Sequence, residues 1–488
     1  MKKIISVITL SIVVIVFFLG FIDRDSNGVF NVNADIVYSI NSIPDNLRTV
    51  ANLDKRQQDI ICAVSKGLIE VDSDGNIRPA LAECVDITDE GIQYTFKIRD
   101  DVYWSDGSKI TADDIVMFFK EVILEENQED IDGLLNVYGV REYINSNNNF
   151  NNTVAIYADN NQLIMRLNSK DDDFIYELAK PQYRVRKNVL NWEFINSNYG
   201  SMKYSGDYSI TSINDEEVIL TRNIKANEDL PKVIHIVEDK SEDLALAAFE
   251  VGNRNIVIDP PMNQLERLKD EGKLITLPSN KSVYLSFNTD DSGLPISGRK
   301  YVYDLITRAI EDYVEENNSA MFLAEGEYYR EENTDASKLQ ERKVLSKNDN
   351  TWNEGRNVIL VAEKTVENKE LVNVIGQWFE KNTDILLITR LIDKNAISES
   401  IASGYYDVVI INEEVGSSDD VYSIVNEYNS ELVVTTWQEN DYSIMEDSMF
   451  NSYSLVPLLF YNENIAVNEI KNIELDINGN IIFSSIEK

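Results

Sequence analysis

The stretch YTFKIRDDVYWSDGSKITADDIVMFFK, residues 94–120, decides the fold. Apolar and aromatic side chains alternate from Tyr94 to Trp104, which is the period of a half-buried strand with its aromatics on one face. Asp106 and Gly107 then predict a turn, because glycine tolerates the positive φ that tight turns need. The first half of the stretch is therefore a strand that ends in a turn.

A helix is predicted to follow the turn. Thr111 is a good N-cap, and Asp113 and Asp114 fall in the first helical turn, where the helix dipole favours negative charge. Strand, turn and capped helix explain the whole stretch by structure. No catalytic role is needed for Trp104 or Asp106.

Strand and helix patterns are mixed along the rest of the chain. Segments with the period of two are DIVYSI, NTVAIYA, QLIMRL and EEVILTR. RQQDIICAVSKGL and SEDLALAAFEVG instead carry apolar residues at the spacing of one helix face. The fold class is therefore mixed α/β.

The C-terminal half opens with a polar, weakly periodic segment at 315–354, which we expect to be a long surface excursion or a loose linker. A strand at 357–364 and a helix at 367–383 follow. The predicted apolar face of that helix comprises Leu371, Val374, Ile375 and Trp378. The pattern continues as strand, helix and strand, the order of a right-handed, mostly parallel α/β unit.

The charge balance restricts the partners. The chain has 84 Asp and Glu against 45 Lys and Arg, a net charge of −39, which repels phosphate backbones, so no nucleic-acid partner is expected. An acidic surface that keeps a secreted protein soluble is one interpretation, and attraction of cationic ligands is the other.

Catalytic and metal-binding motifs are missing from the sequence. His235 is the single histidine, which excludes sites that pair two histidines, and Cys62 and Cys84 fit no zinc spacing. The two cysteines either form a disulfide or are two buried thiols. The sequence also lacks a P-loop, G-x-S-x-G and G-x-G-x-x-G. We therefore expect no enzyme, no cofactor and no metal site.

The N-terminus predicts a position at a membrane. The run from Ile4 to Ile22 is uncharged and would span about 28 Å as a helix, close to the thickness of a bilayer core. We expect a hydrophobic helix at 1–22, a polar linker at 23–34 and an extracytoplasmic remainder. A small-x-Ala cleavage pattern ends at Ala34, so a retained anchor and a cleaved signal peptide both stay open.

Several sequence blocks occur in the order of one known family. They are GLIEVDSDGNIRPALAE at 67–83, the stretch at 94–120, SGDY at 205–208, LALAAFEVGNRNIV at 244–257, YLSFNT at 284–289, GYYDVVI at 404–410 and LVPLLFYNENIAV at 455–467. In these blocks the chain resembles family 5 of the extracellular solute-binding proteins, which feed oligopeptide, dipeptide and nickel ABC importers. The block from 67 to 120 is the most specific.

The resemblance implies a two-lobed fold like that of periplasmic binding proteins (type II, cluster C), whose lobes close over a ligand at a hinge. It implies a first lobe at 35–66, 183–282 and 461–488, an additional subdomain at 67–182 and a second lobe at 283–460. Such proteins do no covalent chemistry and present their closed lobes to a membrane permease. We expect a monomeric receptor that delivers a peptide or similar small solute to ABC transporter permease subunits.

Candidate ligand contacts come from four places in the sequence. They are Leu53, Asp54, Lys55 and Arg56 near the N-terminus, Tyr284 and Asn288 at the lobe crossover, Tyr405, and the acidic residues Glu413, Glu414, Asp419 and Asp420. The alternative is structural: Tyr284 and Asn288 only hold the crossover strand, Lys55 is a surface charge, and the acidic stretch is a solvated loop.

The chain departs from the family at two positions that matter for function. Lipid-anchored members carry a cysteine after the apolar run, where this chain has Phe21, so a retained helix would replace the lipid as a tether. Peptide-binding members have Gly-Trp-x-x-Asp, which falls on Asn412, Glu413 and Gly416, so the ammonium-binding role is not carried over. This loss supports an alternative function, a degenerate ectodomain with an interaction or sensing role and no transported substrate.

Overall fold

The structure is a computed structural model that describes residues 35–72, 75–88, 91–146, 149–290, 292–330, 342, 357–416, 418–428 and 442–487. The hydrophobic helix expected at 1–22 and the linker expected at 23–34 lie outside these residues. Within the described ranges, no helix combines the length and the apolar character needed to cross a membrane.

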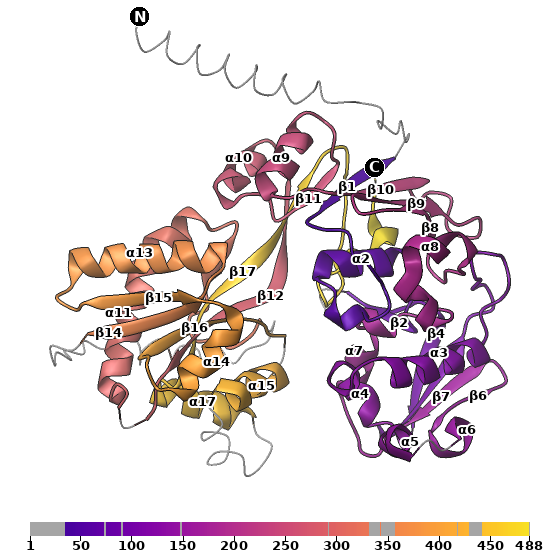
Figure 1. Cartoon of the computed structure of the whole chain (residues 1–488), viewed down its shortest axis with the longest axis horizontal. Coiled ribbons are helices and arrows are strands. Elements are labelled where there is room, and N and C mark those ends of the chain that lie inside the picture. Colours follow the sequence, from indigo (N-terminus) through magenta and orange to yellow (C-terminus); the bar gives the residue numbers. More distant parts are fainter. Residues whose placement is uncertain are drawn as a thin grey trace, which may run out of the picture.

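Figure 1 shows two lobes that share one mixed sheet. Its order is β15-β14-β16-β12-β17-β11-β1-β10-β9-β8, and β13 pairs with β17. The strands are β1 (Ile36–Ile40), β8 (Tyr208–Ile213), β9 (Glu217–Arg222), β10 (Val233–Glu238), β11 (Ile256–Ile258), β12 (Leu274–Phe287), β13 (Met321–Leu323), β14 (Val358–Glu363), β15 (Leu387–Ile392), β16 (Val408–Glu414) and β17 (Leu455–Val467). The expected two-lobed α/β architecture is confirmed.

Two long antiparallel strands, β12 and β17, run from one lobe into the other. Their register shifts between the pair Pro278–Asn462 and the pair Ser282–Phe460. Three residues of β12 lie between these pairs, opposite one residue of β17. A bulge of this kind breaks the ladder and bends the strand. We place the hinge at this bulge and keep the expected domain bounds as a proposal.

Each part of the molecule has its own hydrophobic core. The core of lobe I includes Ile36, Tyr38, Ile60, Trp192 and Ile465. The core of the additional subdomain includes Phe96, Trp104, Ile115, Phe118 and Phe119. The core of lobe II includes Val283, Ile306, Leu360, Ile375 and Val409. Because the cores are separate, each lobe can keep its packing while the strands between the lobes bend.

The opening stretch forms the strand, turn and helix that the sequence predicts. The subdomain sheet has the order β4-β5-β7-β6, and α3 (Ala112–Glu125) begins after a capping box between Thr111 and Asp114. Gly107 has φ +83° in the turn, and the Trp104 N–H donates to the Ser108 carbonyl at 2.8 Å. The strand itself is shorter than predicted and ends at Ile98. The subdomain strands are β2 (Ile69–Val71), β3 (Ile77–Pro79), β4 (Ala82–Thr88), β5 (Gln93–Ile98), β6 (Ile156–Asp159) and β7 (Gln162–Arg166).

Helices cover the sheets of both lobes. The described helices besides α3 are α2 (Lys55–Val64), α4 (Asp132–Leu135), α5 (Val140–Ser146), α6 (Phe150–Thr153), α7 (Phe174–Leu178), α8 (Ile195–Asn198), α9 (Glu242–Glu250), α10 (Leu265–Asp270), α11 (Ile296–Glu316), α13 (Val366–Asn382), α14 (Lys394–Ala402), α15 (Ser418–Tyr428) and α17 (Tyr442–Ser452). In lobe II, β14 pairs in parallel with β15 and β16, as the strand and helix order predicts. The buried face of α13 differs in part from the prediction, since Val372 and Phe379 are buried, whereas Val374 and Trp378 are only half-buried.

The expected surface excursion at 315–354 is wrong for its first part. Residues 321–323 form β13, which pairs with β17, and Tyr328 is buried with its hydroxyl donating to the Leu455 carbonyl at 2.6 Å. A short apolar run completes the lobe II core here. The sequence pattern did not reveal this run, because the segment is polar on average. Residues 331–341 and 343–356 lie outside the described part of the chain.

The two cysteines and the histidine lie at separate places in the fold. Cys62 is buried and Cys84 is exposed, and both are free thiols, so neither the disulfide nor the pair of buried thiols is found. His235 on β10 lies 2.6 Å from a carboxylate oxygen of Glu217 on the neighbouring strand. This contact joins two strands of lobe I.

Candidate functional site

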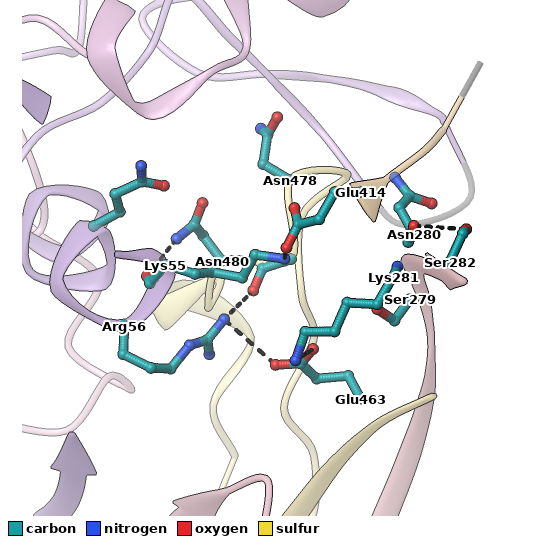
Figure 2. Close-up of polar contacts among 12 residues, drawn as sticks. Lys55, Arg56, Ser279, Asn280, Lys281, Ser282, Glu414, Glu463, Asn478 and Asn480 are labelled. Carbon is teal, nitrogen blue, oxygen red and sulfur yellow. Dashed lines mark hydrogen bonds and ion pairs between the residues drawn. The ribbon is translucent and has the colours of Figure 1, made fainter. Parts of the chain in front are cut away.

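A polar site lies where the two lobes meet beside the hinge (Figure 2). Lobe I contributes the first turn of α2 and the turn at 476–480, the hinge contributes 279–282 of β12, and lobe II contributes the end of β16. Segments from the beginning, middle and end of the sequence therefore converge here.

An ion pair joins the lobes directly. The Lys55 ammonium on α2 lies 2.6 Å from Oε1 of Glu414, the last residue of β16. The side chain of Lys55 is 19% exposed and that of Glu414 is 52% exposed. Asp54 precedes Lys55 as the N-cap of α2 and forms a capping box with Gln57, which fixes the direction in which the helix begins.

A second set of charges continues from α2 into the hinge. The Arg56 guanidinium lies 3.5 Å from Oε1 of Glu463 on β17, and Oε2 of Glu463 lies 3.6 Å from the Lys281 ammonium on β12. Lys281 also contacts the Asp259 carboxylate at 2.9 Å. Cations and carboxylates therefore alternate from lobe I across both hinge strands.

Burial changes the pKa of the charges in the hinge. Burial raises the pKa of Glu463 and Asp259 adds to the shift, although Lys281 and Arg56 oppose it. Burial lowers the pKa of Lys281, but Asp259 and Glu463 outweigh burial and the net shift is upward. The alternation of charge thus keeps the half-buried Lys281 ammonium protonated.

Asp59 anchors this site in lobe I. Its carboxylate is fully buried and accepts hydrogen bonds from the Tyr38 hydroxyl at 2.6 Å, the Ile481 N–H at 2.9 Å and the Asn480 side-chain amide at 3.1 Å. It also lies 3.2 Å from the Arg56 guanidinium. Asp59 therefore ties α2, β1 and the C-terminal segment together.

The turn at 476–480 joins lobe I to the subdomain and the hinge. The Ile477 N–H donates to the Val71 carbonyl of the subdomain at 3.0 Å, and the Ile477 carbonyl accepts from the Asn280 side chain at 3.4 Å. Gly479 has φ +74°, and a Cβ there would lie 2.8 Å from the Lys55 ammonium. Glycine at this position therefore leaves room for the lysine.

Asp476 gives the turn a pH-dependent contribution to stability. Burial raises its pKa to about 6, although Arg184 at 3.8 Å and two backbone N–H donors oppose the shift. A carboxyl pKa raised by folding means that the folded state gains protons as the pH falls through about 6. This contribution therefore stabilises the protein at lower pH and is lost as the pH rises.

We expect lowering the pH from about 7 to about 5 to stabilise the wild type by about 1 kcal/mol more than the Asp476→Asn variant, which has no proton to gain. Thermal unfolding across this pH range measures the difference. The matched control is Asp106→Asn, because hydrogen bonding to Lys203 lowers the pKa of the exposed Asp106 well below the range tested. An identical pH slope for wild type and Asp476→Asn would contradict this role.

The structure brings together three of the predicted contacts, Lys55, Arg56 and Glu414. Leu53 is partly buried against the lobe I core, and Asp54 serves as a helix cap. Lys55 is therefore part of an inter-lobe contact rather than an isolated surface charge.

Tyr284 and Asn288 are held by contacts within lobe II, and Tyr405 lies before β16, at the opposite end of that strand from this site. Tyr284 is fully buried, and its hydroxyl donates to the Tyr328 carbonyl. The Asn288 side chain donates to the carbonyls of Gly404 and Tyr406, at the start of the loop into β16. Tyr405 is 70% exposed in that loop, nine residue steps before Glu414, and β16 itself spans six of these steps or about 20 Å. Burial and contacts favour the structural alternative for Tyr284 and Asn288.

The remaining acidic candidates surround the end of β16. Glu413 is half-buried and pairs in register with Ser282 of β12. Asp420 accepts a hydrogen bond from the Gly416 N–H at 3.0 Å. The side chain of Asp419 lies outside what the structure describes. Within the described ranges, no group of three or more His, Cys, Asp or Glu is arranged to hold a metal ion.

Five residues of the site were not predicted from the sequence: Asp59, Asp259, Lys281, Glu463 and Asn480. The sequence does contain one indication of Glu463, because three polar residues at 462–464 interrupt the otherwise apolar run of β17. A charged residue in a strand that is apolar on both sides requires a buried partner. The partners themselves lie too far away in the sequence to be identified from it.

A cavity of about 540 Å³ occurs elsewhere, between the subdomain and lobe I. Its lining includes Arg99, Trp104, Asp207 and Lys225. These residues do not belong to the inter-lobe site, so this cavity is separate from it.

Comparison with known proteins agrees with the geometry. The model of the family described as bacterial extracellular solute-binding proteins, family 5 Middle, matches residues 76–304. The dipeptide-binding protein of Lactococcus lactis is 30% identical over 148 residues, which are 30% of this chain and 25% of that protein. The oligopeptide-binding protein OppA of Bacillus subtilis is 24% identical over 282 residues, 55% of this chain and 50% of that protein. The match thus spans about a quarter to a half of the length of these relatives.

The fold match extends over nearly the whole chain. The structure of NikA from Brucella suis, in complex with Fe(III)-EDTA, superposes with a TM-score of 0.69 at 15% identity, covering 93% of this chain and 99% of that chain. Two lobes, two hinge strands and a polar site between the lobes define the class of two-lobed solute-binding proteins. Over residues 76–304 the chain is similar to family 5 of the bacterial extracellular solute-binding proteins. Proteins of this family are transport receptors and not enzymes.

Proposed function

We propose that this protein is an extracytoplasmic receptor that captures a peptide or similar small solute between its lobes and delivers it to the permease of an ABC importer. The observation that carries the proposal is the β12–β17 strand pair, whose bulge lies between two separately packed lobes. Such a joint lets the lobes rotate as rigid bodies when a ligand binds the closed arrangement more tightly.

The relatives support a peptide as the solute. Dipeptide- and oligopeptide-binding proteins are among the proteins that match this chain in sequence. An extended peptide can gain main-chain hydrogen bonds from strand edges while its side chains fill adaptable pockets. The polar groups at the end of β16 and in the turn at 476–480 would then orient its charged groups. Tethering by the segment at 1–22 and a monomeric state are part of this proposal.

Retention of a solute tests the proposal. We expect native mass spectrometry of the purified protein to show a bound small molecule, and a peptide library to contain members that raise its melting temperature. A matched mixture of free amino acids serves as the control for nonspecific stabilisation. The complete absence of a retained or stabilising solute would contradict a receptor function.

A degenerate ectodomain with a sensing or interaction role is the second candidate. It is favoured by the end of β16, where the side chain of Asn412 donates to Asn368 at 2.8 Å within lobe II and no tryptophan or aspartate occupies the family positions. Under this alternative the lobes would keep their fold, but the screen would find no solute.

A further inference from the structure

We infer that Lys55 is the contact for a ligand carboxylate and that Glu414 occupies this contact when no ligand is bound. The inference rests on the proposed function and adds the chemistry of the bound group. It begins from the position of a carboxylate from lobe II against an ammonium group from lobe I, at 2.6 Å.

The two partners of this ion pair differ in how firmly they are held. The α2 backbone at Lys55 is fixed, because the Lys55 carbonyl accepts a hydrogen bond from the Asn480 side chain at 2.9 Å. The Lys55 side chain runs along Gly479, where a Cβ would approach the ammonium to 2.8 Å. Glu414 instead ends its strand and has half of its side chain in solvent. Glu414 can therefore rotate away at little cost while Lys55 stays in place.

The other cations of the site have carboxylates of their own. Arg56 faces Asp59 and Glu463, and Lys281 faces Asp259 and Glu463. These carboxylates belong to lobe I and the hinge strands. Within the described residues, the carboxylate within ion-pair distance of Lys55 is that of Glu414, from the opposite lobe.

This difference makes Lys55 the cation of the site whose partner a ligand carboxylate can replace. A ligand carboxylate that replaces Glu414 leaves every other ion pair of the site intact. Figure 2 shows the Lys55 ammonium directed at Glu414 rather than toward Glu463.

The overall charge of the protein makes such a local cation necessary for an anionic group. The net charge of −39 repels carboxylates from most of the surface. A solute with a carboxylate therefore requires a specific positive group at the site that binds it. A peptide with a free carboxyl terminus meets this requirement, and the same peptide with an amidated terminus does not.

The test compares two forms of one probe on five proteins. The probe is a tripeptide library with free carboxyl termini and the same library with amidated termini, and native mass spectrometry measures the amount of each that is retained. The proteins are the wild type, Lys55→Gln, Lys55→Arg, Glu414→Gln and Glu83→Gln. Glu83 is the matched control, because it also lies 2.6 Å from a lysine, Lys97, with 46% of its side chain exposed, but within the subdomain.

The wild type should retain the free-acid library about five- to tenfold better than the amidated library, as expected of one charge-assisted contact. Lys55→Gln should abolish this preference and Lys55→Arg should preserve it. Glu414→Gln should increase retention of the free acids about two- to fivefold without affecting the amides, because the internal competitor is gone. Glu83→Gln should behave as the wild type.

Two results would overturn the inference. If peptides bind but Lys55→Gln keeps the preference for free acids, or the wild type shows none, the inference is wrong and the proposed function stands. If none of the five proteins retains any peptide of either library, the proposed function fails and the inference fails with it.

Discussion

The Asp59→Asn variant is expected to be less stable than the wild type by about 3–5 kcal/mol, the cost of removing one partner from a buried ion pair. The Asp59 carboxylate is fully buried and receives the Tyr38 hydroxyl, the Ile481 N–H and the Arg56 guanidinium. An asparagine supplies one acceptor oxygen and places an NH₂ group among donors. Arg56 would then keep its charge in a position where only 13% of its side chain is exposed.

Thermal unfolding followed by calorimetry measures this loss. The matched control is Tyr38→Phe, which removes one hydrogen bond to the same carboxylate and should cost only about 1 kcal/mol. If both variants lost the same small amount, Asp59 would be one hydrogen-bond acceptor among many and not the anchor of the inter-lobe site.

The Trp104→Ala variant should lose about 3–5 kcal/mol of stability, the usual cost of truncating a large aromatic side chain in a core. Trp104 is 2% exposed, and its indole N–H lies 3.4 Å from the Asp114 carboxylate. The Lys187 ammonium lies 5.1 Å from the centre of its ring. Truncation would leave a cavity between the turn and α3 and remove a cation–π contact.

Hydrogen exchange locates this effect. The Trp104→Ala variant should lose amide protection in the subdomain, at β5, β7 and α3, while α11 and α13 of lobe II keep theirs, because the two cores are separate. Tyr103→Ala is the control, since this neighbour is only half-buried and its loss should cost about 1 kcal/mol or less. Equal loss of protection in both lobes would contradict independent packing of the subdomain and lobe II.

Local chemistry explains why the opening stretch could be predicted. A capping residue, an Asp-Gly turn and a period of two are set by neighbours in the sequence, and Thr111 and Gly107 take the conformations that these rules require. The parallel pairing of β14 with β15 and β16 could be predicted as well, because a chain that alternates strands and helices can adopt only a few topologies.

The inter-lobe site could be predicted only in part because its partners are remote in sequence. Arg56 donates to the Gly479 carbonyl across 423 positions, and no periodicity relates two residues so far apart. Alternation also cannot tell which end of a strand lies at the hinge. Tyr405 and Glu414 both looked like site residues, but Tyr405 precedes β16 and only Glu414 lies at the end of β16 that meets lobe I.

Small-angle X-ray scattering of the purified protein tests the central claim, that two lobes rotate about the β12–β17 bulge to enclose a solute. The radius of gyration should fall when a peptide shown to bind by native mass spectrometry is added, and it should stay constant with a peptide that does not bind. Identical scattering curves with and without a peptide that is demonstrably bound would contradict hinge closure.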